Sequence, residues 1–314
     1  MCLLAVAGGK FTVNTRGDAY DTSAFNRSSF FLRKYDVKPQ IKVSSTEESR
    51  LYGVDLGARP LGQKNAFSTN GIVKRYGQER PDVLVLGDSH AIMWAAVIDD
   101  VCREKGLTVS FFATAGASPF FKIPVPSQME GMPGFTPQQK RQFDMRRLEC
   151  IKEWKPLVIL SARWAGHLNV EESRDLIDYI GQCGARVLLV EQPPQVDMGN
   201  HNSAQYLTYR GYSPSQSGHR ISFPQAEPVE VARGQATIRS LAREYPFCSI
   251  LKTYDYYAPD DKNAFIIDGR NILYIDNHHL TTAGTFLVRS RFVQALSNLG
   301  VDRTKTRRTP REGP

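Results

Sequence analysis

The chain has 314 residues, of which 41% are hydrophobic, and a formal net charge of +8. A chain of this length forms one large domain, or one domain with appendages, and buries a sizeable core. Its five scattered cysteines lack the paired spacing of zinc sites and dense disulfide frameworks. Nucleic-acid binding would rest on the modest positive charge alone, so we expect no nucleic-acid partner.

Residues 1–78 are predicted to be an N-terminal extension or linker outside the main domain. Residues 8–78 are polar, rich in Ser, Thr and Arg, and only weakly periodic. Residues 1–7 are apolar, but they are far fewer than the ~18 apolar residues of a transmembrane helix, and they lack a signal peptide's charged region. Two interpretations remain open for them, the stub of a lost membrane segment and a buried strand. Residues 300–314 are predicted to be a basic disordered tail.

Residues 79–299 alternate between short apolar runs and helical segments. The run at 83–86 predicts a strand buried on both faces, and a helix over 91–105 follows it. Thr136 is the expected N-cap of a later helix. The remaining strands are predicted at 107–112, 157–160, 187–190, 249–251 and 272–275, and the remaining helices at 137–154, 170–182, 228–243 and 281–299. Such alternation predicts an α/β domain, with a parallel sheet between two layers of helices.

A long insertion rich in Gly, Ser, Pro, Asn and Tyr lies between residues 191 and 228. Loops of this length inside a compact domain are usually functional or disordered. This insertion follows a predicted strand, where open α/β sheets place their binding crevice. We therefore expect it to border a binding site.

The sharpest local motif is Gly87-Asp88-Ser89-His90, between a predicted strand and a predicted helix. A serine at such a turn presents its hydroxyl over the carboxyl edge of the strand, as the nucleophile of α/β-hydrolases does. The free N–H groups of the incoming helix could stabilise an oxyanion there. On this motif alone Ser89 has two open interpretations, an activated nucleophile and an ordinary helix N-cap.

A second motif, Asp276-Asn277-His278-His279, also lies between a predicted strand and a predicted helix. A serine nucleophile needs a base, and the base needs an orienting group. Asp276 and His279 are three residues apart, so one tight turn can bring the carboxylate to the imidazole. We therefore prefer His279 as the base for Ser89, with Asp276 stabilising the imidazolium. His278 is the competing base, and a helix-capping Asp with surface histidines is the structural alternative.

The two motifs together resemble the SGNH hydrolase superfamily. Residues 87–90 (GDSH) are similar to its block I, and residues 276–281 (DNHHLT) are similar to its closing D-x-x-H-L-[ST] block. Further pieces resemble the SGNH domain fused to bacterial membrane acyltransferases that O-acylate surface polysaccharides. These are VILSARW at 158–164, EQPP at 191–194 and LYID at 273–276. The likeness covers roughly residues 75–299.

The resemblance implies a flavodoxin-like three-layer sandwich with a central parallel sheet over residues 79–299. It implies an O-acyltransferase or acyl esterase acting on a cell-surface glycan through an acyl-enzyme on Ser89, with no cofactor and no metal. Transfer and hydrolysis share this intermediate and differ in whether a sugar hydroxyl or water attacks it. The expected partners are a glycan acceptor and a membrane acyltransferase domain as acyl donor. The expected location is therefore extracytoplasmic, periplasmic or at the cell surface, and membrane-associated.

The groups that would bind the oxyanion depart from the superfamily pattern. Arg163-Trp164 stands where the block III Asn would be expected, and Gly116 is the candidate for the block II glycine. The oxyanion would then rest on the amides of Ser89 and Gly116. Arg163 adds charge, and Asp88 supports the turn. Trp164 is either a substrate contact or a packed core residue.

Tyrosines are the candidates for contact with a sugar, because carbohydrates usually meet aromatic faces. Ordinary loop packing is the alternative for each of them. The candidates in the insertion are Tyr206, Tyr209 and Tyr212, and those after it are Tyr254, Tyr256 and Tyr257.

Two other functions remain open. The aspartates and histidines of both motifs fit a metal-dependent phosphoesterase, but such a site needs more ligands, and no histidine precedes His90. Chelator sensitivity would favour this alternative. A non-catalytic glycan-binding domain on the same fold is the other, and covalent labelling of Ser89 would argue against it.

Overall fold

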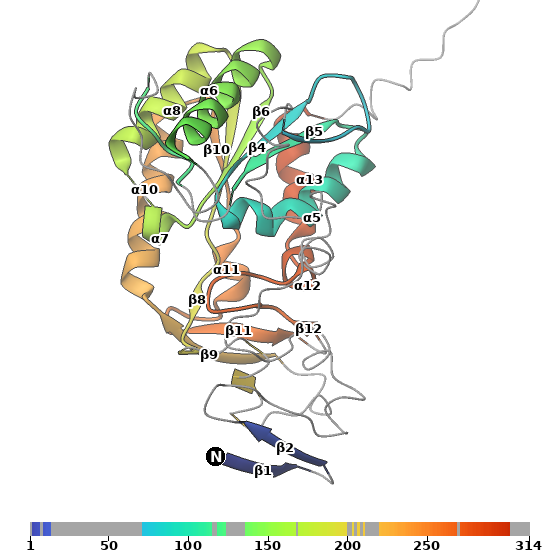
Figure 1. Cartoon of the computed structure of the whole chain (residues 1–314), viewed down its shortest axis with the longest axis vertical. Helices are drawn as coiled ribbons and strands as arrows, with labels where there is room; N and C mark the ends of the chain where they lie inside the picture. The colour runs from blue at the N-terminus through green and yellow to red at the C-terminus, as the bar shows by residue number, and fades with distance from the viewer. Residues whose placement is uncertain are drawn as a thin grey trace, which may run out of the picture.

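The computed structural model describes residues 2–6, 9–13, 71–114, 118–123, 136–167, 169–199, 203, 206–207, 210, 220–268 and 271–301. A six-stranded sheet of order β10-β7-β6-β4-β5-β3 lies at its centre (Figure 1). Its strands are β3 (Ile72–Lys74), β4 (Val83–Gly87), β5 (Val109–Ala113), β6 (Leu157–Ser161), β7 (Arg186–Val190) and β10 (Cys248–Leu251). All neighbours are parallel except β3, an antiparallel edge strand beside β5. In chain order the parallel strands have the spatial order 2-1-3-4-5, which confirms the flavodoxin-like fold.

Helices cover both faces of this sheet and complete the expected three layers (Figure 1). The helices α5 (Ser89–Glu104) and α13 (Arg289–Asn298) cover one face, and the other is covered by α6 (Pro137–Trp154), α8 (Val170–Gln182) and α10 (Pro228–Glu244). Alternate residues of β4 enter opposite cores: Val83 and Val85 pack with α5, and Leu84 and Leu86 pack with α6. Full burial of such a side chain contributes roughly 1.5–3 kcal/mol to the stability of the fold. Because both faces of β4 are covered, every position gains from an apolar residue, and the strand is continuously apolar.

The start of α6 follows the sequence prediction. Oγ1 of Thr136 accepts a hydrogen bond from the Gln139 amide at 3.2 Å, and Oε1 of Gln139 accepts one from the Thr136 amide at 3.0 Å. This reciprocal capping box satisfies two backbone N–H groups that the helix itself would leave unpaired. The predicted N-cap is therefore confirmed.

A smaller antiparallel sheet, of order β12-β11-β9-β8, was not predicted. It contains β8 (Gln195–Val196), β9 (Ile221–Ala226), β11 (Asn263–Asp268) and β12 (Asn271–Ile272). Two of these strands belong to the 191–228 insertion, which is therefore partly ordered as sheet. The pattern was hidden because β8 and β12 are two residues long and β9 contains Pro224.

The prediction of a central strand at 272–275 is wrong. Only its first residue is in a strand, β12, and β12 pairs with β11 in the smaller sheet. Tyr274 makes a single bridge to Leu280 instead. Asp276 and His279 therefore lie on a separate loop, and not at the carboxyl edge of a central strand.

The helix predicted at 281–299 is divided into α12 (Thr282–Phe286) and α13. The break follows from a tertiary hydrogen bond: the hydroxyl of Tyr257 donates to the Gly284 carbonyl at 2.9 Å. That carbonyl also accepts from the Leu287 amide at 3.3 Å, and the Val288 amide donates to Thr285 instead. The chain consequently tightens and changes direction between the two helices.

The domain begins before residue 79, because β3 already belongs to the central sheet. Near the N-terminus, β1 (Cys2–Val6) pairs antiparallel with β2 (Gly9–Val13), so residues 2–6 are a strand. The rest of the predicted extension up to residue 70, and the predicted tail from residue 302, lie outside the described residues. No helix in the described part of the chain is long and apolar enough to cross a bilayer.

Candidate active site

The turn between β4 and α5 holds Ser89 beside the end of β6. Gly87 has φ +156°, and a Cβ built on it would lie 1.8 Å from the carbonyl oxygen of Ser161 and 2.5 Å from Cβ of Ala91. Only glycine fits this close approach. Asp88 is the N-cap of α5, so Ser89 becomes the first residue of the helix. The sequence GDS therefore places a hydroxyl between the carboxyl ends of β4 and β6, where the strand order reverses.

The loop that follows β12 carries Asp276 and His279 to this turn. Oδ1 of Asp276 accepts hydrogen bonds from the amides of His278 at 2.9 Å and His279 at 2.8 Å. The carbonyl of His279 accepts a hydrogen bond from the Ile275 amide at 2.7 Å, so both backbone polar groups of His279 are paired within the loop. The Leu280 amide donates to Sδ of Met93 on α5 at 2.9 Å. These contacts fix the loop against the helix that begins with Ser89.

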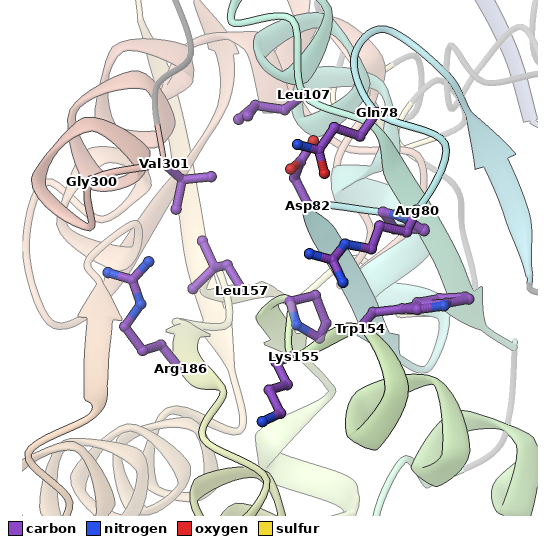
Figure 2. Close-up of a pocket in the computed structure, with 12 residues that line it drawn as sticks. Gln78, Arg80, Asp82, Leu107, Trp154, Lys155, Leu157, Arg186, Gly300 and Val301 are labelled. Atoms are coloured by element: carbon purple, nitrogen blue, oxygen red, sulfur yellow. The ribbon is translucent and has the colours of Figure 1, made fainter. Parts of the chain in front are cut away.

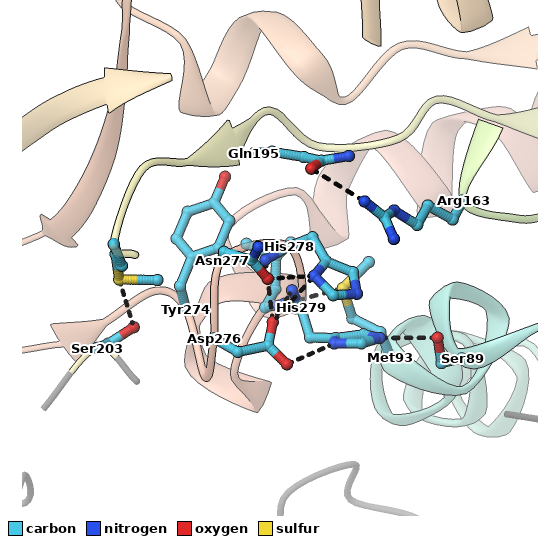
Figure 3. A network of polar contacts seen from close by, with 12 residues as sticks. Ser89, Met93, Arg163, Gln195, Ser203, Tyr274, Asp276, Asn277, His278 and His279 are labelled. Carbon is cyan, nitrogen blue, oxygen red and sulfur yellow. Dashed lines mark hydrogen bonds and ion pairs between the residues drawn. The ribbon is translucent and has the colours of Figure 1, made fainter. Parts of the chain in front are cut away.

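Ser89, His279 and Asp276 form a continuous hydrogen-bonded chain (Figure 3). The Ser89 hydroxyl lies 2.7 Å from Nε2 of His279, and Nδ1 of His279 lies 2.8 Å from Oδ2 of Asp276. The carboxylate selects the tautomer in which Nδ1 carries the proton and Nε2 accepts. A serine, a base and an orienting carboxylate thus stand in the geometry of a Ser-His-Asp triad.

The charges of the triad allow His279 to accept a proton and to keep it as an imidazolium. Burial opposes the charged form of His279, but the charge and hydrogen bond of Asp276 outweigh it and raise the pKa of His279. Burial likewise opposes the charged form of Asp276, but His279 and the amide of His278 hold the pKa of this carboxyl below its usual range. Asp276 therefore stays ionised and stabilises an imidazolium at His279.

His278, the competing base, faces other groups. Its Nδ1 contacts Oδ1 of Asn277, and burial and the charge of His279 lower the pKa of His278 to about 3. A neutral imidazole with so low a pKa is a weak proton acceptor. The geometry therefore places His279, and not His278, against the Ser89 hydroxyl.

Comparison with protein families assigns this chain to a known family. A family model described as "SGNH domain (fused to AT3 domains)" matches residues 61–294, well over half of the sequence. The chain belongs to the SGNH domain family. It is therefore an SGNH hydrolase-type domain, and its family supports esterase or acyltransferase activity. The AT3 domains in the family's description link such domains to a membrane-associated system.

Two solved structures resemble this SGNH domain at 14% sequence identity. One is a protein of Bacteroides fragilis assigned as an acylhydrolase, with a TM-score of 0.46 over 76% of this chain and 97% of that chain. The other is a GDSL-like lipase of Bacteroides thetaiotaomicron, with a TM-score of 0.41 over 69% of this chain and 88% of that chain. Comparison with curated proteins gives no match.

Arg163 follows β6 and lies near His278 and His279. Its guanidinium donates to Oε1 of Gln195 at 3.4 Å (Figure 3). It also lies 3.3 Å from Oε2 of Glu227. Its charge lowers the pKa of His278 and opposes the rise at His279. A cation placed here can attract an anionic acyl-transfer intermediate.

The interpretation of Trp164 as a substrate contact is wrong. The side chain is 2% exposed, and its Nε1 donates to the Val190 carbonyl at 2.7 Å. Its ring lies 5.6 Å from that of Phe120, and Gly234 of α10 packs against its backbone. Trp164 is therefore a core residue that holds the start of the short helix α7 (Trp164–His167).

The remaining predicted site residues are divided between packing and undescribed positions. Tyr206 is partly buried, with its ring 5.0 Å from that of Phe223. Asn169, the nearest asparagine after β6, was not a predicted site residue, and it caps α8 by accepting from the amides of Glu171 and Glu172. Gly116, Tyr209 and Tyr212 lie outside the described residues.

Three supporting residues were missed by the sequence reasoning. Glu191 is 1% exposed and accepts hydrogen bonds from Arg239 and from the Thr253 amide. Gln192 accepts from the Ala165 amide at 3.0 Å and so holds the segment after Arg163. His90, the third, is buried beside the two histidines of the loop. The EQPP and GDSH motifs contained these residues, but their spacing gave no signal for such contacts.

A pocket of about 550 Å³ lies at the other end of the central sheet (Figure 2). Its lining includes Asp82, Leu157 and Arg186, at the amino ends of β4, β6 and β7. Arg80 and Lys155 add positive charge at its wall. Because Ser89 follows the carboxyl end of β4, this pocket is separate from the candidate active site.

Proposed function

We propose that this SGNH domain is an O-acyltransferase, or acyl esterase, that modifies a cell-surface glycan through an acyl-enzyme on Ser89. The observation that carries the proposal is the hydrogen-bonded chain from Ser89 through His279 to Asp276, with contacts of 2.7 and 2.8 Å. Membership of the SGNH domain family supports acyl-ester chemistry for this domain.

In the first half-reaction, Oγ of Ser89 attacks the carbonyl carbon of the acyl donor while Nε2 of His279 takes the hydroxyl proton. Asp276 remains ionised and stabilises the imidazolium. When the tetrahedral intermediate collapses, the bond to the leaving alcohol breaks and His279 returns the proton to that alcohol. The acyl group is then an ester of Ser89.

In the second half-reaction, a hydroxyl of the glycan loses its proton to His279 and attacks the Ser89 ester. The bond to Oγ breaks, Ser89 regains a proton from His279, and the glycan carries the acyl group. Attack by water gives hydrolysis by the same steps. The oxyanion of each intermediate would be met by the Ser89 amide at the start of α5 and by the Arg163 charge, with the Gly116 amide as a further donor.

The AT3 fusion in the family's description supports a membrane partner. We propose that a membrane acyltransferase domain delivers the acyl group and that the acceptor is a polysaccharide outside the cytoplasm. The glycan would approach the carboxyl ends of β4 and β6, because Ser89 and Arg163 both lie there.

The test is turnover of p-nitrophenyl acetate by the wild type and by Ser89→Ala, His279→Ala and Ser240→Ala. Ser240 is exposed on α10 and is the matched serine control. We expect the first two variants to lose ~10³-fold or more in kcat/KM, because both residues act in one unit. Ser240→Ala should keep the wild-type rate. Equal rates for the wild type and Ser89→Ala would contradict the proposal.

Transfer is distinguished from hydrolysis by adding an acceptor. With an acetyl donor and a bacterial surface polysaccharide, the wild type should form acetylated glycan that Ser89→Ala does not form. Release of free acetate alone, at a rate unaffected by the polysaccharide, would identify an esterase and rule out the transferase.

A further inference from the structure

Three imidazoles meet beside Ser89. His90, His278 and His279 offer ring nitrogens that all lie within 4.8 Å of one another. The His90 ring stacks on that of His278 with centroids 5.5 Å apart and lies 5.2 Å from that of His279. The rings of His278 and His279 are 4.0 Å apart. We call these three residues the histidine cluster.

His90 has no role in the proposed reaction, yet it is fully buried. Neither Nδ1 nor Nε2 of His90 has a hydrogen-bond partner among the described residues. A buried polar group without a partner costs about 1–3 kcal/mol, whereas an apolar side chain of similar shape would avoid that cost. An unpaired imidazole in this position therefore indicates a ligand for its nitrogens.

The other two histidines also present ring nitrogens suited to a ligand. Nδ1 of His279 is held by Asp276, and this carboxylate–imidazole pairing is the one that orients histidines for metal binding through Nε2. Nδ1 of His278 contacts Asn277, which leaves its Nε2 available for coordination. Side-chain oxygens of Asp276 and Asn277 thus orient two of the three imidazoles.

We propose that the histidine cluster binds a divalent transition-metal ion, with Zn²⁺ as the best fit, and that the bound ion switches the active site off. Imidazole ligands suit zinc, and three of them leave the fourth tetrahedral position for a water or for the Ser89 hydroxyl. At Zn–N distances of 2.0–2.1 Å the nitrogens would lie ~3.4 Å apart, so the rings must draw closer by roughly 1 Å. The Asp276 carboxylate beside the cluster offsets part of the metal's charge.

The inhibitory part of this inference rests on the proposed function. Nε2 of His279 accepts the Ser89 proton with the lone pair that would bind the metal. A bound ion occupies that lone pair, so His279 can no longer act as the base. No covalent bond is made or broken, and a chelator should restore activity fully.

The test is a titration of tag-free, chelator-treated protein with Co²⁺, followed by visible absorption. The deciding variant is His278→Gln, because His278 is partly exposed and its replacement should fold; thermal unfolding checks this. His167→Gln, which changes a histidine outside the cluster, is the matched control. We expect the wild type and His167→Gln to bind one Co²⁺ per chain with the intense bands of a tetrahedral site, and Zn²⁺ to displace it. His278→Gln should bind at least ~10-fold more weakly.

Absence of tetrahedral bands in the wild type, or equal affinity in folded His278→Gln, would overturn the metal site. The spectrum needs no turnover, so its outcome is independent of the proposed function. Esterase assays in Zn²⁺ then test the switch: inhibition that follows the wild-type binding curve and reverses in chelator supports it, and full activity of the zinc-loaded protein contradicts it. If the protein bound the metal but never turned over an ester, the proposed metal site would stand and the proposed function would be refuted.

Discussion

Oδ2 of Asp88 accepts a hydrogen bond from the backbone N–H of Arg163 at 2.8 Å. Its other oxygen, Oδ1, accepts from the His90 amide at 2.7 Å. One carboxylate, 1% exposed, therefore joins the turn that carries Ser89 to the segment after β6. We infer that Asp88 is a positioning residue, which sets where the nucleophile lies relative to the Arg163 charge.

Asp88→Ala should therefore impair catalysis as well as stability. Loss of two hydrogen bonds to a buried carboxylate should lower the free energy of unfolding by about 2–4 kcal/mol. We also expect kcat to fall at least ~10-fold with little change in KM, because the nucleophile is displaced. Urea denaturation and ester hydrolysis measure the two effects.

Asp260 provides the matched control for this prediction. It also accepts two backbone hydrogen bonds, from Lys262 and Asn263 at 2.7 Å each, but on an exposed loop. Asp260→Ala should leave kcat unchanged. A wild-type kcat in folded Asp88→Ala would show that the carboxylate has no positioning role.

Gly87→Ala should prevent the turn from forming. A Cβ at this position would meet the Ser161 carbonyl oxygen at 1.8 Å, and backbone cannot yield as a flexible side chain does. We expect a protein that does not fold, or one destabilised by at least ~4 kcal/mol. Gly184→Ala is the control: φ is +75° but no atom lies within 4 Å, so only the left-handed strain of about 1–2 kcal/mol should appear. Equal thermal stabilities of the two variants would refute the steric argument.

The pH dependence of turnover should report His279. Its pKa is raised above the ordinary 6.5, because Asp276 outweighs burial. The base must be neutral, so kcat/KM should fall as the pH decreases through a midpoint above 6.5 and be level above it. The raised pKa also means that protonated His279 stabilises the folded state. This stabilisation is fully present below the pKa of His279 in the unfolded chain, and it is lost as the pH rises through the pKa of His279 in the folded protein.

Asp276→Asn tests the cause of this shift. Without the carboxylate of Asp276, burial is the largest influence on His279 and lowers its pKa, Arg163 lowers it further, and the charge of Asp88 opposes them only in part, so the midpoint should move below 6.5. The plateau rate should fall by about 10²–10⁴-fold, because the imidazolium loses its partner. Profiles measured in chelator-containing buffer, between pH 5 and 9, show both changes. An unchanged midpoint would mean that Asp276 does not set this pKa.

Breaking the buried ion cluster of α6 should strongly destabilise the fold. Asp144 is 0% exposed and pairs with Lys140 and with Arg147, which is 1% exposed and packs over Phe121 and Phe143. Asp144→Ala would leave the two buried cations without an anionic partner and should cost about 3–5 kcal/mol in urea denaturation.

Glu244→Ala is the comparison for this variant. It breaks an exposed pair with Arg174 and should leave the unfolding midpoint nearly unchanged, because solvent screens the pair. If both variants had the same midpoint, the buried cluster would not be a stabilising feature.

The elements marked by local sequence features, such as helix caps and apolar runs, could be predicted from the sequence. The helices at 137–154 and 170–182 were predicted with their observed bounds. Thr136 could be recognised as the cap of the first, whereas the cap of the second, Asn169, is a finding of the structure. The apolar runs of β4, β6 and β7 could be recognised because both of their faces are buried. The grouping of Ser89, Asp276 and His279 could be anticipated because each motif flanks a helix and only a short turn separates the acid from the base.

The features that depend on tertiary contacts could not be predicted. Ile272 and Tyr274 look like a strand, yet the hydroxyl of Tyr274 donates to the Pro194 carbonyl, and this fixes a loop instead. Trp164 has no local signal that distinguishes a buried indole from an exposed one. His90 follows the nucleophile directly in sequence, but only the folded chain brings it against His278.

The most direct test of the account is mass spectrometry of the protein after brief mixing with an acetyl donor. We predict an added acetyl group on the wild type, located by peptide mapping at Ser89, and none on Ser89→Ala. His279→Ala should remain unmodified on the same timescale, because its serine lacks a base. Acetyl at another residue, or equal labelling of the wild type and Ser89→Ala, would contradict the central role of Ser89.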